Sequence, residues 1–257
     1  EGEETAVELL AALERGDRDL SSIPGLAYLD GTALVRTPCR ERIRDLDGLP
    51  WPAWDLFDPA AYHRHGLVIG LDAGMTMPIL ATRGCPYACT YCSSATMWTR
   101  RWAARNPVDV VDEIEHYQQT YGATNFPFQD LTAILKKEWV VAFCEELLRR
   151  GLRITWQFPS GTRCEVIDAE VARLLARTGG RSLAFAPESG SARTRALIGK
   201  ELSEESLLAA VRASVKEKLN ITCFFVVGFP HDTMADLKET FRLVRRLAVA
   251  GIDDVAV

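Results

Sequence analysis

From Met77 onward, short apolar segments alternate with amphipathic helical patterns, and this repeat restricts the folds open to the chain. Strands that alternate with helices form right-handed βαβ units around a parallel sheet. The strands we expect are 77–82, 125–128, 153–158, 182–186, 221–227 and a sixth that begins near Asp254. The sequence therefore predicts an α/β fold, a partial (β/α)6 barrel like an incomplete TIM barrel, in which chemistry gathers at the C-terminal ends of the strands.

A different pattern occupies the first 76 residues. Residues 5–15 have a helical face that ends at Gly16, and the apolar segments 26–29 and 32–35 flank Asp30-Gly31, which favours a type I′ hairpin turn. Residues 37–59 contain four prolines with aromatic residues between them, which is typical of an extended connector. We therefore expect a short helix, hairpin and linker in 1–76 and the barrel in 77–257.

Charge and composition exclude some classes of protein. The net charge is −5, so no overall basic field favours nucleic acid as a partner. The chain contains no apolar run long enough to span a membrane, and its first residues are acidic rather than a basic signal region. We expect a cytoplasmic protein.

Three cysteines lie within eight residues, in the loop that follows the first expected strand. Cys85, Cys89 and Cys92 stand on a segment with Gly84 and Pro86, so their thiols can converge on one point. Three of seven cysteines clustered in a chain without an export signal favour metal ligation over disulfides, and thiolates are the ligands of iron–sulfur clusters. The alternatives are a zinc site, which needs four ligands, or a chance cluster.

The spacing C-x3-C-x2-C directly after a strand, with Tyr91 before the third cysteine, resembles the signature of the radical S-adenosylmethionine (SAM) superfamily. The resemblance implies a [4Fe-4S] cluster held by Cys85, Cys89 and Cys92, with one iron open for the amino and carboxylate groups of SAM. It further implies reductive cleavage of SAM to a 5′-deoxyadenosyl radical, a small-molecule substrate, and an electron donor such as flavodoxin or ferredoxin.

The resemblance also implies SAM contacts at the ends of the second and third strands. Gln129 or Asp130 stands where the family often has a Gly-Gly-Glu-like element for the SAM ammonium, although this chain lacks those glycines. Arg163 is placed to pair with the SAM carboxylate. The alternatives are a helix cap or turn for Asp130 and a surface salt bridge for Arg163. Cys164 is either a thiol near the substrate or a buried inert residue.

Two later strand ends complete the expected site. Glu188 and Ser189 belong to a Glu-Ser-Gly element similar to one in many family members, where they would bind the ribose or the amino acid end of SAM. Gly228 lets the backbone approach the adenine, although a glycine required only for the turn would look the same. The other cysteines, Cys39, Cys144 and Cys223, are expected to be packing residues.

Nearly the whole chain resembles a subgroup in which a cobalamin-binding domain precedes the barrel. The first segment, through Asp47-Gly48-Leu49-Pro50, is similar to the connector after that domain in C-methyltransferases and the anaerobic magnesium-protoporphyrin ester cyclase. No Asp-x-His-x-x-Gly element occurs, so cobalamin would bind through a domain outside this chain, which we expect to be a fragment of a longer enzyme. Methylation or remodelling of an unactivated carbon is the expected reaction.

Two other functions remain open at this point. One is a radical-SAM methylthiotransferase acting on RNA or protein, a class with an additional cysteine-bearing domain. The other is a non-catalytic iron–sulfur electron-transfer or binding protein, which would have a fourth protein ligand to the cluster.

Overall fold

The computed structural model describes residues 1–257, and its contacts divide them into two compact units, 1–46 and 47–257. Residues 47–76, which the sequence assigns to a connector, pack with the second unit. The domain boundary between 76 and 77 stays a prediction. No helix in either unit has the length and apolarity needed to cross a bilayer.

The first unit consists of helix α1 (Glu3–Glu14) and a hairpin of strands β1 (Ala27–Asp30) and β2 (Ala33–Arg36). Arg40, which follows the hairpin, joins the two parts. Its guanidinium pairs with Glu4 at 3.0 Å and with Glu8, and its Nε donates to Thr5 Oγ1 at 2.8 Å. The expected helix and hairpin are therefore both present in this unit.

The hairpin turn lies one residue later than the sequence predicts. Asp30 pairs with Ala33, so Gly31 and Thr32 form the loop in place of Asp30-Gly31. Only Gly31 has positive φ, at +58°, which matches a type II′ turn with glycine in its first central position rather than type I′.

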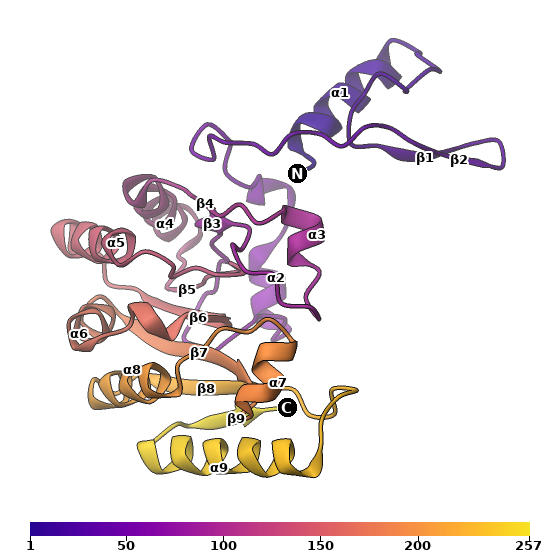
Figure 1. Cartoon of the computed structure of the whole chain (residues 1–257). Coiled ribbons are helices and arrows are strands. Elements are labelled where there is room, and N and C mark those ends of the chain that lie inside the picture. Colours follow the sequence, from indigo (N-terminus) through magenta and orange to yellow (C-terminus); the bar gives the residue numbers. More distant parts are fainter. The chain divides into compact units, whose positions relative to one another are not determined.

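The second unit is built on a five-stranded parallel sheet with the strands in sequence order. They are β5 (Asn125–Pro127), β6 (Thr155–Thr162), β7 (Gly180–Glu188), β8 (Asn220–Phe225) and β9 (Asp254–Ala256). Figure 1 shows the helices α4, α5, α6 and α8 side by side along the sheet, as expected of βαβ units. The predicted open, partial (β/α) barrel is confirmed.

Prolines weaken the strand that precedes the cysteine loop. Residues 75–79 lie parallel to β5, with bridges from Thr76 to Asn125 and from Ile79 to Phe128. Pro127 has no N–H to donate to this ladder, so the pairing is interrupted where a regular strand would continue. The chain then forms β3 (Thr82–Arg83), which pairs antiparallel with β4 (Ala103–Ala104).

The long helices agree with the sequence pattern, whereas three short ones were not expected. The long helices of this unit are α4 (Pro107–Tyr121), α5 (Lys137–Arg150), α6 (Ala169–Arg177), α8 (Glu204–Lys216) and α9 (Met234–Ala250). The short ones are α2 (Pro59–Arg64), α3 (Ser94–Trp98) and α7 (Ala192–Leu197), and single turns of 3₁₀ helix, η1 and η2, cover Trp54–Leu56 and Cys164–Val166. Helices of one or two turns carry too little periodicity to be recognised in a sequence.

Aromatic rings fill the core between the sheet and its helices. Phe128, Phe143, Trp156 and Phe158 are at most 1% exposed, and their ring centroids lie 5.0–5.8 Å apart in mostly edge-to-face pairs. This geometry adds to the free energy gained from burial. The rigid core fixes the strand ends that carry the site.

Gln157 on β6 holds the backbone at Leu71, just before the segment 75–79 that lies parallel to β5. Its amide accepts from the Leu71 N–H at 2.7 Å and donates to the Leu71 carbonyl at 2.9 Å. Asn125 donates to the same carbonyl at 3.0 Å. These buried amides therefore satisfy the backbone of Leu71 as a neighbouring strand would.

Gly179 offers a test of the packing between α6 and the sheet. A Cβ at this position would lie 1.9 Å from the carbonyl oxygen of Ile154, whereas one at Gly151, after α5, would meet nothing within 4 Å. Both glycines have positive φ. We predict that Gly151→Ala lowers the free energy of unfolding by about 1–2 kcal/mol and that Gly179→Ala costs about 1–3 kcal/mol more. Urea unfolding measures both variants, and equal losses would refute the close approach.

Candidate active site

Asp130, three residues after the end of β5, holds the base of the cysteine loop. Its carboxylate accepts from the backbone N–H groups of Ala81 (3.3 Å) and Thr82 (2.5 Å) and from the Thr82 hydroxyl (2.5 Å). The residue is 2% exposed. Burial raises the pKa of Asp130 to about 6, against the lowering effect of these hydrogen bonds. Its contact with the SAM ammonium stays a prediction.

The three expected ligand cysteines follow on this loop, and two of their sulfurs accept hydrogen bonds. The Thr132 hydroxyl donates to Cys85 Sγ at 3.3 Å, and the backbone N–H of Ser94 donates to Cys92 Sγ at 3.4 Å. Hydrogen bonds to sulfur stabilise thiolate charge and tune iron–sulfur clusters. Cys89 Sγ lies 3.8 Å from the carbonyl oxygen of Gly199, which follows α7. Cys85 and Cys89 are half-buried and Cys92 is exposed.

No three His, Cys, Asp or Glu side chains lie close enough to share a single metal ion. A [4Fe-4S] cluster has a different requirement, because each thiolate binds its own iron and the sulfurs surround a cluster instead of one ion. Three thiols on one loop, two of them with donors at sulfur, fit such a cluster by their chemistry. Their assignment as ligands stays a prediction.

The structure brings Tyr91 and Glu188 together across 97 positions of sequence. The Tyr91 hydroxyl donates to Glu188 Oε1 at 2.7 Å, and Lys200 Nζ lies 3.2 Å from the same oxygen. Burial, and next the hydrogen bond to Glu188, raise the pKa of Tyr91 above its usual value, so the phenol stays a neutral donor. Sequence reasoning missed Lys200. The sequence did contain one indication: Lys200 is a basic residue that directly follows Gly199, in a loop that comes after the end of β7.

Glu188 stands in a strained turn at the end of β7. Its φ is +63°, and the N–H of Ser189 bonds to the carbonyl of Pro187 at 2.7 Å across it, which makes a γ-turn. Positive φ is costly for a residue with a Cβ, and such strain gathers at functional sites. The turn directs the Glu188 side chain to Tyr91 and Lys200.

Ser189 takes part in packing against α9. The side chain is 2% exposed, its hydroxyl lies 3.1 Å from Thr240 Oγ1, and it accepts from the N–H of Ser191 at 3.1 Å. The Ser189 hydroxyl therefore bonds to groups on α9 and in its own turn rather than to Tyr91 or Glu188. Its expected role toward SAM stays a prediction.

Arg163, after β6, contacts the cysteine loop through Tyr87. Its guanidinium lies 4.2 Å from the centre of the Tyr87 ring, pairs with Glu165 at 2.6 Å and donates to the carbonyl of Glu201 at 2.8 Å. This geometry is compatible with both roles expected for Arg163, a salt bridge and a contact with SAM, since the pair with Glu165 exists and Arg163 lies beside the cysteine loop. Its pairing with the SAM carboxylate stays a prediction.

The loop after β8 reaches the site through an aromatic contact. The Phe229 ring lies 5.8 Å from Tyr91 and stacks on His231 at 5.7 Å. Gly228 has a φ of +92°, and a Cβ added there would meet no atom within 4 Å, so the conformation of the loop is what requires glycine. Its approach to adenine stays a prediction.

The cysteines outside the loop divide into two groups. Burial raises the pKa of Cys144, Cys164 and Cys223 to about 12 each, so these core residues stay protonated and unreactive. Of the two roles expected for Cys164, the structure therefore favours the buried, inert residue over the thiol near the substrate. Cys39 is exposed, and its expected role in packing is wrong.

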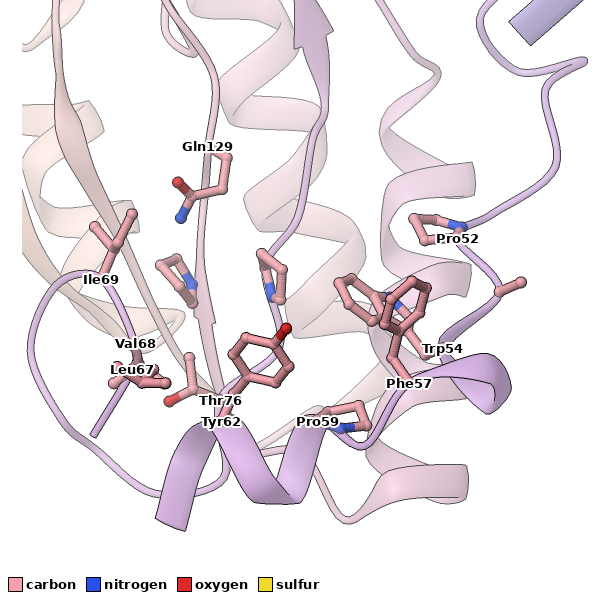
Figure 2. A pocket seen from close by; sticks show the side chains of 13 residues that line it. Pro52, Trp54, Phe57, Pro59, Tyr62, Leu67, Val68, Ile69, Thr76 and Gln129 are labelled. Carbon is pink, nitrogen blue, oxygen red and sulfur yellow. The ribbon is translucent and has the colours of Figure 1, made fainter. Parts of the chain in front are cut away.

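Gln129 lies in a separate pocket, which Figure 2 shows beside α2 and which β5 and the segment 76–78 also line. The cavity is about 560 Å³ and is lined by Trp54, Phe57 and Tyr62 on one side and by Pro78, Pro127 and Gln129 on the other. Gln129 is thus near the cysteine loop in sequence but faces this pocket, apart from Tyr91 and Glu188.

Comparison with known proteins agrees with this arrangement. The family model of the radical SAM superfamily matches residues 79–244. The chain is 29% identical over 249 residues to an uncharacterized methyltransferase of Pyrococcus horikoshii, covering 97% of this chain and 52% of that protein. It is 28% identical over 247 residues to the anaerobic magnesium-protoporphyrin IX monomethyl ester cyclase of Cereibacter sphaeroides, covering 95% of this chain and 39% of the cyclase.

Among solved structures, the cobalamin-dependent S-adenosylmethionine radical enzyme OxsB with aqua-cobalamin bound has a similar fold. The TM-score is 0.77 at 19% sequence identity, and the match covers 95% of this chain and 35% of OxsB. The chain thus spans about half or less of the length of these relatives.

The raised pKa of Asp130 predicts a pH dependence of stability. The folded state binds the Asp130 proton up to about pH 6, whereas an unfolded chain releases it near pH 4. The free energy of unfolding therefore falls as the pH rises from about 4 to 6, by about 2–3 kcal/mol from this group. We predict that Asp130→Asn removes this fall. The difference in unfolding free energy between the wild type and the variant, measured by urea unfolding at a series of pH values, should then change between pH 4 and 6. A difference that is independent of pH would contradict the prediction.

Proposed function

Because this chain belongs to the radical SAM superfamily, we propose that it forms the core that binds a [4Fe-4S] cluster through Cys85, Cys89 and Cys92 and cleaves SAM reductively. Membership implies the cluster and SAM as cofactors. The observation that carries the assignment is the cysteine loop, which follows β3 and the segment 75–79 that lies parallel to β5, with donors to two of its three sulfurs.

When bound, the cluster supplies the electron that splits SAM into methionine and a 5′-deoxyadenosyl radical. The chain's own contribution is to hold and orient. Asp130 fixes where the loop leaves the strand. Thr132 donates to Cys85 Sγ, and its carbonyl accepts from the Trp102 indole N–H, so it helps to fix the first sulfur. Contacts from residues outside the cysteine loop therefore help to hold it in position.

Glu188 is the best candidate among the SAM contacts. Tyr91 and Lys200 both use its Oε1, and Oε2 makes no hydrogen bond within the protein. A carboxylate that is 7% exposed with one oxygen unused can accept from a hydroxyl or ammonium group of SAM. Lys200 and Tyr91 would hold the carboxylate in place for this contact.

We further propose that the reaction is cobalamin-dependent methylation or remodelling of an unactivated carbon. The supporting observations are the names of the relatives, a methyltransferase and a cyclase, and the fold shared with OxsB. Cobalamin would bind outside these 257 residues. A cytoplasmic location and an electron donor such as flavodoxin or ferredoxin belong to the same proposal.

Anaerobic reconstitution with iron and sulfide tests the cluster assignment. We predict that the wild-type chain takes up iron and sulfide in equal amounts and, with reductant and SAM, releases 5′-deoxyadenosine detectable by mass spectrometry. Single Cys→Ala changes at 85, 89 or 92 should abolish both, because each thiolate binds its own iron.

The matched control is Cys39→Ala, since Cys39 is exposed and lies outside the loop. It should keep the full cluster content and full release of 5′-deoxyadenosine. A wild type without cluster, or a loop variant that retains it, contradicts the proposal. A cluster that forms but never cleaves SAM would instead favour the non-catalytic iron–sulfur protein.

A further inference from the structure

The pocket in Figure 2 has the size and lining of a ligand site. Its volume of about 560 Å³ falls within the range of about 300–1,000 Å³ that small-molecule sites occupy. Three aromatic side chains, Trp54, Phe57 and Tyr62, form one wall, and the prolines 78 and 127 form part of the other. No Lys, Arg, His, Asp or Glu lines it.

Gln129 is the polar group on the sheet side of this pocket that has no partner. Its side-chain amide makes no hydrogen bond within the protein, while the other polar group on that side, Thr76, donates to the Gly74 carbonyl at 2.8 Å and accepts from Asn125 at 2.9 Å. Gln129 is half-buried, and its amide is free to donate to and accept from a ligand in a lining that is otherwise mostly apolar. Figure 2 shows the Gln129 side chain among the residues that line the pocket.

The pocket and the cysteine loop are linked through one segment of the chain, because Gln129 lines the pocket and the residues after it contact the loop. Gln129 precedes Asp130, the residue that fixes the loop, and Thr132 donates to Cys85 Sγ at 3.3 Å. Three residues of extended chain span about 10 Å, so the Cα of Gln129 lies within that distance of the Cα of Thr132. The backbone at this edge of the pocket therefore lies within about 10 Å of the residue that donates to Cys85 Sγ.

We propose that this pocket binds the ring system of the substrate, a neutral and largely apolar molecule with a hydrogen-bonding group opposite Gln129 and no phosphate or carboxylate inside the pocket. The assignment of the ligand as substrate rests on the proposed function. The exclusion of anions follows from the lining, because an anion would lose water and gain no cation. The aromatic wall supplies apolar contact area and ring stacking.

Two matched probes test this inference on the 257-residue chain, with dissociation constants from ligand-observed NMR. We expect 2-naphthamide to bind and 2-naphthyl phosphate to bind at least about 10-fold more weakly. Gln129→Leu should weaken 2-naphthamide about 3- to 10-fold, since one hydrogen bond is lost. The control Gln119→Leu, on the exposed face of α4, should change nothing.

A second variant uses an added charge to test whether the probes bind inside this pocket. Ile69 lines the pocket and is 57% exposed, so a lysine there can be accommodated without disturbing the core. Ile69→Lys should strengthen binding of 2-naphthyl phosphate several-fold and leave 2-naphthamide nearly unchanged.

Three results would overturn the inference: no binding of either probe, as expected if another protein segment covers the pocket; equal binding of both probes; or no effect of Gln129→Leu. Release of 5′-deoxyadenosine is measured on the same preparations and separates the two proposals. If the probe pattern holds while SAM is not cleaved, the binding site stands and the proposed function fails. If SAM is cleaved and the probe pattern is absent, this inference fails alone.

Discussion

The arrangement of the site depends on one buried carboxylate. Asp130 accepts three hydrogen bonds from Ala81 and Thr82, two positions where a strand weakened by proline turns into the cysteine loop. The backbone pairing of 75–79 with residues 125–129 is interrupted at Pro127 and ends with the bond from the Gln129 N–H to the Ile79 carbonyl, before Ala81 is reached. A charged group in the interior is costly, and the raised pKa of Asp130 expresses that cost. The protein thus gives up stability to fix the point from which three cysteines are presented.

Around this point, the loops after four strands meet the cysteine loop, each through a different interaction. The β5 loop supplies the donor to Cys85, the β6 loop stacks Arg163 on Tyr87, β7 offers Glu188 to Tyr91, and the β8 loop packs Phe229 on the same tyrosine. Parallel sheets bring such loops to one edge by their topology. The cysteine loop is therefore positioned by the whole sheet.

Much of this fold could be predicted from the sequence because it rests on local patterns. The strand and helix periods, the glycines that end helices and the three-cysteine spacing are each readable within a few residues. Short helices such as α3 and α7 could not be predicted, because one or two turns carry no clear period. The hairpin turn was displaced by one residue because Asp30 keeps its pairing with Ala33, and this register is a property of the two strands together.

The candidate site was harder to predict for a related reason. Residue types at strand ends identified Glu188, Arg163 and Asp130, but their partners lie between 2 and 97 positions away and depend on the tertiary fold. The hydrogen bonds of Asp130 to Ala81 and Thr82 had no signal in the sequence, and its contact with SAM stays a prediction, while Lys200 gave no motif at all. Cys164 could not be judged until its burial was known. Sequence therefore indicated where the chemistry lies better than it indicated what each side chain contacts.

The central claim is that three cysteines hold a cluster with one iron left open for SAM. Electron paramagnetic resonance of the reduced, reconstituted chain before and after addition of SAM tests it most directly. We predict that SAM changes the g values of the cluster, because its amino and carboxylate groups bind the open iron. An unchanged spectrum at saturating SAM, with the cluster intact, would contradict it and would indicate a fourth protein ligand.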